Sequence, residues 1–193
     1  MAEGITYREA VGRGIAEAIE TDDRVFIMGE DVGAYGGAYA VTKGFLDKYG
    51  ENRVKDTPIS ESVIVGAGIG AAIDGLRPIV EIMTINFSLM AMDQIVNMAA
   101  KIRYMSGGQM SVPLVIRTVT GGGRQLGATH SQSLESWYAR VPGLRVVTPS
   151  TPYDSLGLFR SAMADPNPVI FVEHAVLYGT RGDVPDEPYS IPL

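Results

Sequence analysis

The sequence predicts an α/β fold in which helices cover both faces of a mostly parallel sheet, giving three layers. Two observations predict this class. Short apolar runs with strand character alternate with helical segments along the whole chain, and these runs are apolar enough to be buried on both sides. Such strands are typical of parallel sheets, because crossover helices cover both faces. The length of 193 residues is enough for one domain with a full core.

The elements are expected in a regular order. Thr6 and Glu9 form a capping box, which opens an amphipathic helix that runs through Ile19. The expected strands are short and apolar, at 24–29, 53–56, 79–83, 113–119, 145–149 and 168–173. The expected helices are amphipathic or apolar, at 41–49, 61–76, 87–105, 133–140 and 152–164. Pro78 is expected to end the helix over 61–76.

The domain organisation is expected to be simple. Residues 1–180 are predicted to form one α/β domain. The segment 181–193 contains three of the 11 prolines and several acidic residues, a composition typical of a linker. We expect it to lead toward a C-terminal domain.

The composition excludes several functional classes. The chain has no cysteine, which excludes disulfides, thiolate zinc sites and a cysteine nucleophile. Its net charge of −6 argues against a nucleic-acid groove, which needs clustered lysine and arginine. No window of about 18 apolar residues is present, so no membrane partner is expected. Residues 1–11 lack a basic region followed by an apolar stretch, and a cytoplasmic location is therefore expected.

A glycine-rich run at 63–72, VIVGAGIGAA, has two interpretations. In the first, Gly66, Gly68 and Ala71 match the spacing of a dinucleotide-binding turn, which would make the chain a non-catalytic nucleotide-binding module. That turn requires a preceding strand and an acidic residue about 20 positions later. Glu81 comes too early and within an expected strand.

The second interpretation is a helix that Ser60 caps and that begins near Glu61. Each glycine inside it costs about 1 kcal/mol relative to alanine. Such glycines imply close backbone approach to a neighbouring helix or to a cofactor.

Five segments of the chain follow one known pattern in the same order: GEDVGAYGGAYAVTKG (29–44), DTPISES (56–62), GLRPIVEIMTINF (75–87), DQIVNMAAKIRYMSGG (93–108) and HSQSLESWYARVPGLRVVTPSTPYDSLGL (130–158). Together they resemble the β subunit of the thiamine-dependent, decarboxylating first component of 2-oxoacid dehydrogenase complexes. Pyruvate dehydrogenase is the most similar member, and acetoin or branched-chain 2-oxoacid dehydrogenases are the alternatives. The resemblance corresponds to the N-terminal pyrimidine-binding module of that subunit, which has the transketolase-type fold.

The resemblance implies a thiamine diphosphate site, in which a glutamate hydrogen-bonds the aminopyrimidine ring and favours the tautomer that takes the thiazolium proton. Glu61 stands at the matching position; its alternative role is that of a first-turn acid favoured by the helix dipole. Phe87 matches the aromatic residue that packs on the pyrimidine ring. Ile59 and Glu30 fall in segments that line this half of the site. A proton shared with a ring nitrogen needs a dry site, which the apolar neighbours of Glu61, Ile59 and Val63 among them, are expected to supply.

His130 is the second residue to which the resemblance gives a catalytic role. It follows the glycine-rich loop at 120–127 and matches a histidine at the mouth of the active site, which hydrogen-bonds intermediates or assists acyl transfer to the lipoyl group. The alternative is a surface histidine that caps the following helix. His174 matches no such motif and is expected to be structural.

The resemblance also implies a monovalent cation site, with K⁺ as the candidate ion, at five further residues. They are expected to contribute mainly backbone carbonyls, and they are Leu114, Ala162, Met163, Asp165 and Asn167. Carbonyls at a helix C-terminus carry negative dipole ends, which suits a hard cation. The alternative is an ordinary helix end before Asp165.

The chain is expected to form only part of an active site. Thiamine enzymes hold the diphosphate and Mg²⁺ with a Gly-Asp-Gly segment followed by an asparagine pair, and neither occurs here. The resemblance therefore implies an α subunit that supplies this half, in an α2β2 heterotetramer. The apolar residues of 87–105 lie on most sides of the expected helix, which is typical of a subunit interface. The expected partners also include a small 2-oxoacid, and a dihydrolipoyl acyltransferase with its lipoyl domain; the chain alone is expected to be inactive.

Overall fold

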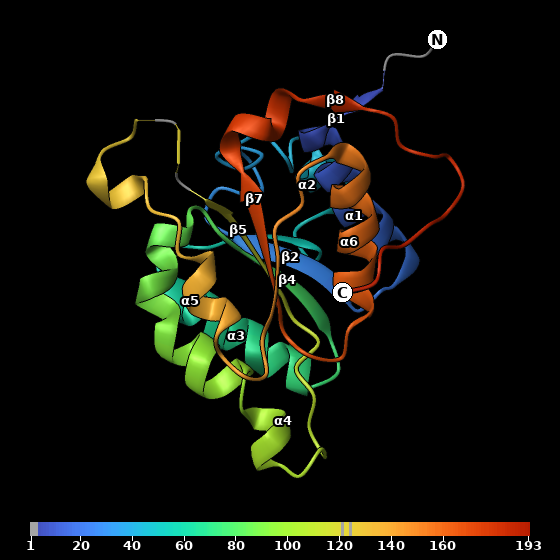
Figure 1. The fold of residues 1–193 in the computed structure, drawn as a ribbon. Helices are drawn as coiled ribbons and strands as arrows, with labels where there is room; N and C mark the ends of the chain where they lie inside the picture. The colour runs from blue at the N-terminus through green and yellow to red at the C-terminus, as the bar shows by residue number, and fades with distance from the viewer. Residues whose placement is uncertain (1–3, 121, 124) are drawn as a thin grey trace.

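The computed structural model describes residues 4–120, 122–123 and 125–193, and its centre is a six-stranded sheet (Figure 1). The spatial order of the strands is β3-β2-β4-β5-β7-β6, and every pair is parallel. The strands are β2 (Val25–Gly29), β3 (Val54–Asp56), β4 (Arg77–Ile82), β5 (Val115–Thr120), β6 (Arg145–Val147) and β7 (Val169–His174). The predicted parallel α/β sheet is confirmed, and each expected strand is present.

Helices cover both faces of the sheet, which confirms the three layers (Figure 1). The α-helices are α1 (Tyr7–Thr21), α2 (Phe45–Tyr49), α3 (Glu61–Ile73), α4 (Ile102–Met105), α5 (Glu135–Ala139) and α6 (Pro152–Ala164). Shorter helical segments are η1 (Ile85–Ala91), η2 (Gln94–Ala99), η3 (Ala128–His130) and η4 (Ala175–Gly179). α1 packs against α6 on one face, and α3 packs against β4, η1 and η2 on the other. Within the described part of the chain, no helix has the length and apolar character needed to cross a membrane.

The start of α1 is the element that the sequence specifies most completely. The Thr6 hydroxyl accepts the amide of Glu9 at 3.2 Å, and the Glu9 carboxylate accepts the amide of Thr6 at 2.7 Å. This is the predicted capping box, and it satisfies two amides that a helix start leaves without partners. The helix then buries Val11 and Ile15 in the core beneath it.

The end of α3 corrects one expectation. Pro78 does not stop this helix but lies second in β4, where it is paired in register with Phe26. The helix ends earlier, because Gly75 has a φ of 98° and turns the chain left-handed. The Gly75 amide then donates to Ala72 O and the Leu76 amide to Ala71 O. This pair of bonds is the Schellman ending, which requires a residue without a Cβ penalty at Gly75.

The expected helix over 87–105 is present only as a series of shorter segments. It begins at 85 as the 3₁₀ segment η1, continues as the π-helical segment η2, and ends with α4. The Ala100 amide donates to Ile95 O, a bond one residue longer than in an α-helix. The inner side of this helical series is buried at Ile95 and Ala99, whereas Met90 on its outer side is 66% exposed. The prediction of one regular helix is wrong. Apolar side chains do lie on both the buried and the exposed side of the segment.

The segment expected to be a linker folds back onto the domain. β1 (Ile5–Thr6) pairs antiparallel with β8 (Arg181–Gly182), a pairing that the sequence did not predict. The Ile191 amide donates to Gly157 O at 3.1 Å, and the Tyr189 ring stacks on Tyr153 with centroids 4.4 Å apart. The end of the described chain therefore lies along α6.

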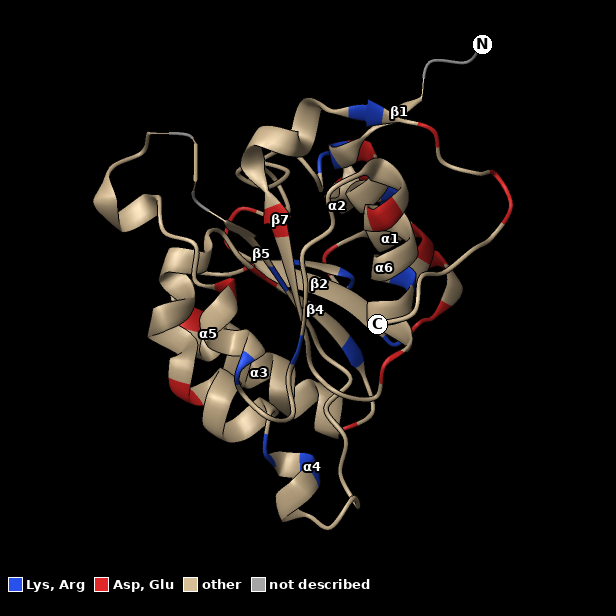
Figure 2. Cartoon of the chain, in the orientation of Figure 1, with Lys and Arg blue, Asp and Glu red and all other residues tan. Residues whose placement is uncertain are grey.

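A buried ionic group connects three central strands. Arg117 on β5 lies between Glu81 on β4 and Glu173 on β7. Figure 2 shows basic and acidic positions, in blue and red, among the central strands of the sheet. It forms an ion pair with Glu81 and donates to a Glu173 oxygen at 2.9 Å; that oxygen also accepts the Tyr178 hydroxyl at 2.7 Å. Burial raises the pKa of Glu81, although the Arg117 charge opposes it. Two carboxylates with one guanidinium leave a negative bias under the C-terminal ends of the strands.

Candidate functional site

Glu61 is the first residue of α3, and its side chain is only 7% exposed. No hydrogen bond joins its carboxylate to another residue of the described chain. The turn before it is fixed by the Thr57 amide, which donates to Gly29 O at 3.0 Å. Ser60 occupies the capping position, but its hydroxyl donates to Pro58 O instead, so the expected side-chain cap is absent. A buried carboxylate at a helix start is available to bind a ligand nitrogen.

The dinucleotide-binding interpretation is wrong. It needs a strand over 63–65, and these residues lie inside α3. The glycine run instead serves packing at one position: a Cβ on Gly68 would lie 2.6 Å from Val80 and 3.2 Å from Leu114. Gly70 has no described atom within 4 Å of its Cβ position. Among the glycines of α3, Gly68 alone meets a close contact from the described residues.

Glu30 lies near enough to Glu61 for the Glu61 charge to act on its pKa. It follows β2 and is 8% exposed. Burial raises the pKa of Glu30, and the charge of Glu61 raises it further, with smaller contributions from Asp31 and Glu81. The raised pKa favours retention of a proton on Glu30.

Phe87 and His130 meet in the same region. Their rings pack edge to face, with centroids 5.0 Å apart and an interplanar angle of 87°. Phe87 lies on η1, which packs against α3, and the Ser62 hydroxyl donates to Met90 O at 2.8 Å. The structure therefore brings the Phe87–His130 pair to the same end of α3 as Glu61. Residues 121 and 124 of the loop before His130 lie outside the described residues.

The described chain supplies only part of the apolar surroundings expected for Glu61. Ile64 and Val65 are buried, but Ile59 is 82% exposed and Val63 is 66% exposed. Ile59 therefore does not enclose Glu61 in the described structure. Met90 is also exposed, and the three side chains form an apolar surface around the start of α3.

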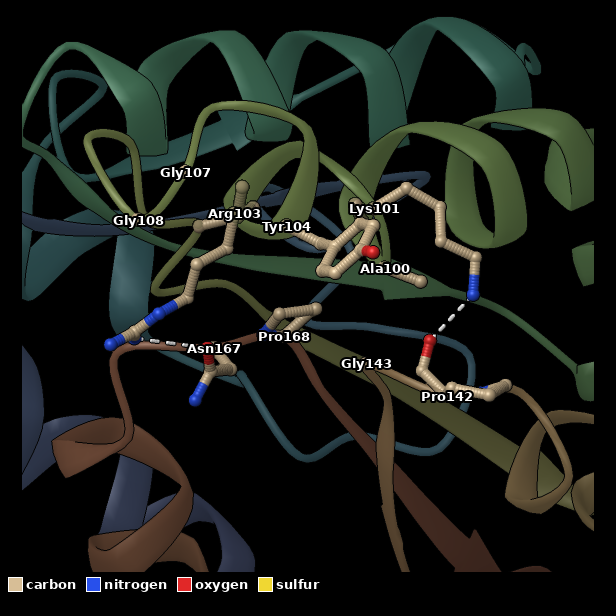
Figure 3. Close-up of a pocket in the computed structure, with 12 residues that line it drawn as sticks. Ala100, Lys101, Arg103, Tyr104, Gly107, Gly108, Pro142, Gly143, Asn167 and Pro168 are labelled. Atoms are coloured by element: carbon tan, nitrogen blue, oxygen red, sulfur yellow. Dashed lines mark hydrogen bonds between the residues drawn. The ribbon is translucent and has the colours of Figure 1, made fainter.

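Four of the five residues of the expected cation site have backbone carbonyls that already accept hydrogen bonds. Leu114 O accepts the Val169 amide at 2.9 Å. The Arg77 guanidinium donates to Met163 O, and it lies 3.5 Å from Asp165 O. Arg103 donates to the Asn167 side chain at 3.1 Å (Figure 3), and Ala162 O accepts the Asp165 amide. Arg77 thus places a positive charge at the carbonyls of Met163 and Asp165. A metal ion at this position stays a prediction.

No alternative metal centre is formed by side chains. Among residues 4–120, 122–123 and 125–193, no three histidine, aspartate or glutamate side chains lie where they could hold a metal ion.

A cavity lies elsewhere in the described structure, beside α4 (Figure 3). Its volume is about 840 Å³, and its lining includes Tyr104, Gly143 and Pro168. Lys101 closes one side by donating to Pro142 O at 2.6 Å. Glu61, Phe87 and His130 do not line it, so it is separate from the candidate site.

Several residues of the site were missed from the sequence. Thr84 donates to Asn86 Oδ1 at 3.1 Å, and Ser88 shares a 2.6 Å hydrogen bond with the buried Tyr138. These polar anchors hold the backbone on either side of Phe87. Asp56 was also missed, although an acidic residue at the C-terminal end of a strand is a general signal for a functional position.

Comparisons with known proteins agree with this arrangement. Residues 3–180 match the family described as transketolase, pyrimidine binding domain. The chain is 49% identical over its whole length to pyruvate dehydrogenase E1 component subunit beta-1, mitochondrial, of Oryza sativa subsp. japonica, and it covers 52% of that protein. It is 51% identical over 94% of its length to pyruvate dehydrogenase E1 component subunit beta of Rhizobium meliloti (strain 1021), covering 39% of it. The chain thus spans about half or less of these relatives.

Solved structures show the same fold. A chain described as split gene transketolase, inactive beta4 tetramer, superposes with a TM-score of 0.69 over 95% of this chain and 53% of the other, at 20% identity. At that identity the likeness speaks for the fold alone. The parallel sheet, the position of Glu61 at the start of α3 and the match over 3–180 lead to one conclusion. The chain belongs to the transketolase pyrimidine-binding domain family.

Proposed function

We propose that this chain is the β-subunit part of a thiamine-dependent 2-oxoacid dehydrogenase first component, acting on pyruvate. The observation that carries the proposal is the buried, unpaired carboxylate of Glu61 at the start of α3, with Glu30 beside it. The pyruvate dehydrogenase names of the relatives support the choice of substrate.

When bound, thiamine diphosphate supplies a carbon acid that becomes a nucleophile after it loses a proton. In the proposal, Glu61 holds a proton at its carboxyl oxygen and shares it with the ring nitrogen of the aminopyrimidine. The pKa of the neighbouring Glu30 is raised by burial and by the charge of Glu61, so Glu30 adds little opposing negative charge beside this proton. Phe87 packs against the pyrimidine face, and His130 lies at the mouth to bind later species.

The exposed surface around Glu61 supports a partner subunit. Ile59, Val63 and Met90 leave the site open to water, and a bound α subunit would cover them. We propose that this partner also holds the diphosphate and Mg²⁺, in an α2β2 assembly. The chain alone would then have no decarboxylase activity.

The remaining steps extend the same proposal. The acyl group formed from the 2-oxoacid passes to the lipoyl domain of a dihydrolipoyl acyltransferase, with His130 assisting. A cytoplasmic location belongs to the proposal as well.

The decisive experiment compares Glu61→Gln with wild type after reconstitution with the α subunit. Glutamine still hydrogen-bonds a ring nitrogen but cannot protonate it. We expect near-normal cofactor affinity and a loss of about 10²- to 10⁴-fold in exchange of the thiazolium proton for deuterium, followed by NMR. His130→Ala is the control, because it should slow only a later step. Exchange at the wild-type rate in Glu61→Gln contradicts the proposed role.

A further inference from the structure

Asp56, the last residue of β3, binds the backbone of a distant loop with both of its carboxylate oxygens. One oxygen accepts the amide of Gly33 at 2.6 Å, and the other accepts the amide of Ala34 at 3.1 Å. The contact is so close that a Cβ on Gly33 would lie 2.7 Å from a carboxylate oxygen. Hydrogen bonds of amides to a charged acceptor are among the stronger ones in proteins.

The loop that Asp56 binds has a conformation that needs external support. Asp31 has a φ of 57°, and Gly36 and Gly37 have φ values of 85° and 83°. A non-glycine residue at positive φ is strained and persists only when surrounding contacts fix it. Two amides bonded to one carboxylate provide such contacts, since they order the backbone directly after Asp31.

The same two segments are joined a second time. The Thr57 amide donates to Gly29 O at 3.0 Å, on the other side of Glu30. Asp56 and Thr57 therefore bracket Glu30 from both sides, through Gly29 and through Gly33 with Ala34. The segment that carries these bonds continues directly into Glu61.

We propose that Asp56 is a positioning residue that holds Glu30 beside Glu61. The catalytic role of this arrangement rests on the proposed function. The effect of Asp56 on the loop after Glu30 does not depend on it. Through these bonds Asp56 fixes the separation between two carboxylates that belong to segments far apart in the sequence. Loss of the two bonds would release the loop after Glu30, while Glu61 would stay on α3.

The charge of Glu61 acts on the pKa of Glu30, so a change in the separation of the two carboxylates can be measured by titration of Glu30. Glu61 faces it from α3, Glu81 from β4 and Asp31 from its own loop, and the Ser60 amide bonds it. Burial and these negative charges raise the pKa of Glu30, whereas the bond from Ser60 lowers it. If the loop is released, Glu30 gains water and moves from Glu61, so its titration should shift downward toward that of an ordinary glutamate.

The test uses the 193-residue chain without cofactor. Asp56→Ala, Asp56→Asn and the control Asp47→Ala, an exposed acid on α2, are compared with wild type by NMR. For Asp56→Ala we expect amide hydrogen exchange at Gly33 and Ala34 to accelerate about 10- to 100-fold, together with a lower titration midpoint of the Glu30 carboxyl. Asp56→Asn, which keeps one acceptor oxygen, should be intermediate, and Asp47→Ala should match wild type. Unchanged exchange and titration in Asp56→Ala overturn the inference.

Two further readouts separate this inference from the proposed function. In the reconstituted enzyme, Asp56→Ala should lower kcat with little change in cofactor affinity, and Asp56→Asn should recover part of it. If Glu61→Gln keeps wild-type proton exchange, the proposed function fails while the loop result stands. If Asp56→Ala does not fold, the wild-type chain supplies the test. The NMR signals of the Gly33 and Ala34 amides must then shift as Asp56 is titrated. Signals that do not shift refute the inference.

Discussion

The Phe87 and His130 rings pack edge to face, with centroids 5.0 Å apart, although 42 residues separate them in the chain. Phe87 follows β4, and His130 follows β5, the adjacent parallel strand. Both rings therefore lie at the carboxyl ends of neighbouring strands, where open parallel sheets place their ligand sites.

Phe87→Ala should weaken cofactor binding more than it destabilises the fold, because the ring is only partly buried in the isolated chain. Aromatic pairs contribute about 0.5–1.5 kcal/mol beyond area burial, so loss of the ring should weaken affinity at least several-fold. Phe87→Tyr is the matched control and should bind almost normally. Cofactor affinity of the reconstituted enzyme, measured by calorimetry, checks this; equal affinity in Phe87→Ala would remove Phe87 from the site.

Glu30→Gln should stabilise the chain at neutral pH relative to wild type. The pKa of Glu30 is raised in the folded chain, so the folded state binds more protons than the unfolded state above about pH 4.3, the ordinary glutamate value. Wild-type stability therefore falls as pH rises through this window, and the glutamine variant lacks that loss. Urea unfolding at pH 4 and pH 7 should give a difference that grows with pH; a difference independent of pH contradicts the prediction.

The glycines of α3 should respond in opposite directions to alanine. Gly68→Ala places a methyl group 2.6 Å from Val80, and overpacking of this kind costs about 1–3 kcal/mol. Gly70→Ala meets no described atom within 4 Å and should stabilise the isolated chain by up to about 1 kcal/mol through helix propensity. Denaturant unfolding of the two variants measures both effects, and Gly68→Ala as stable as wild type would show that the contact relaxes freely.

Arg77→Met should expose a dependence on potassium that wild type lacks. Removal of the guanidinium leaves the carbonyls of Met163 and Asp165 without this donor, at a cost of about 1–3 kcal/mol. A monovalent ion can then approach the same carbonyls, so KCl should raise the variant's Tm above that in choline chloride at equal ionic strength. Arg24→Met, at an exposed position in the turn before β2, is the control. A clear rise of wild-type Tm with potassium would instead place the ion beside Arg77.

Local signals in the sequence determined which elements form. The capping box at Thr6 and Glu9 marks the start of α1, and apolar runs mark the strands of the sheet other than β3, whose sequence is Val-Lys-Asp. Glu61 at the start of a helix, and Phe87 just after a strand, were also accessible, because the 3.6-residue and strand patterns are carried by residues close together in the chain. The same patterns misplaced the end of α3, where Gly75 and not Pro78 decides, and they could not foresee the π-helical turn at Ala100.

Tertiary structure alone decided how the parts of the site meet. Glu30 lies beside Glu61, and Asp56 binds Gly33 and Ala34, because β2 and β3 pair in parallel and bring the ends of both strands to one edge. Likewise, Arg77 reaches Met163 only through the packing of β4 against distant elements. Periodicity states which face of an element is buried, but contacts between segments depend on strand order and register, which no local pattern encodes.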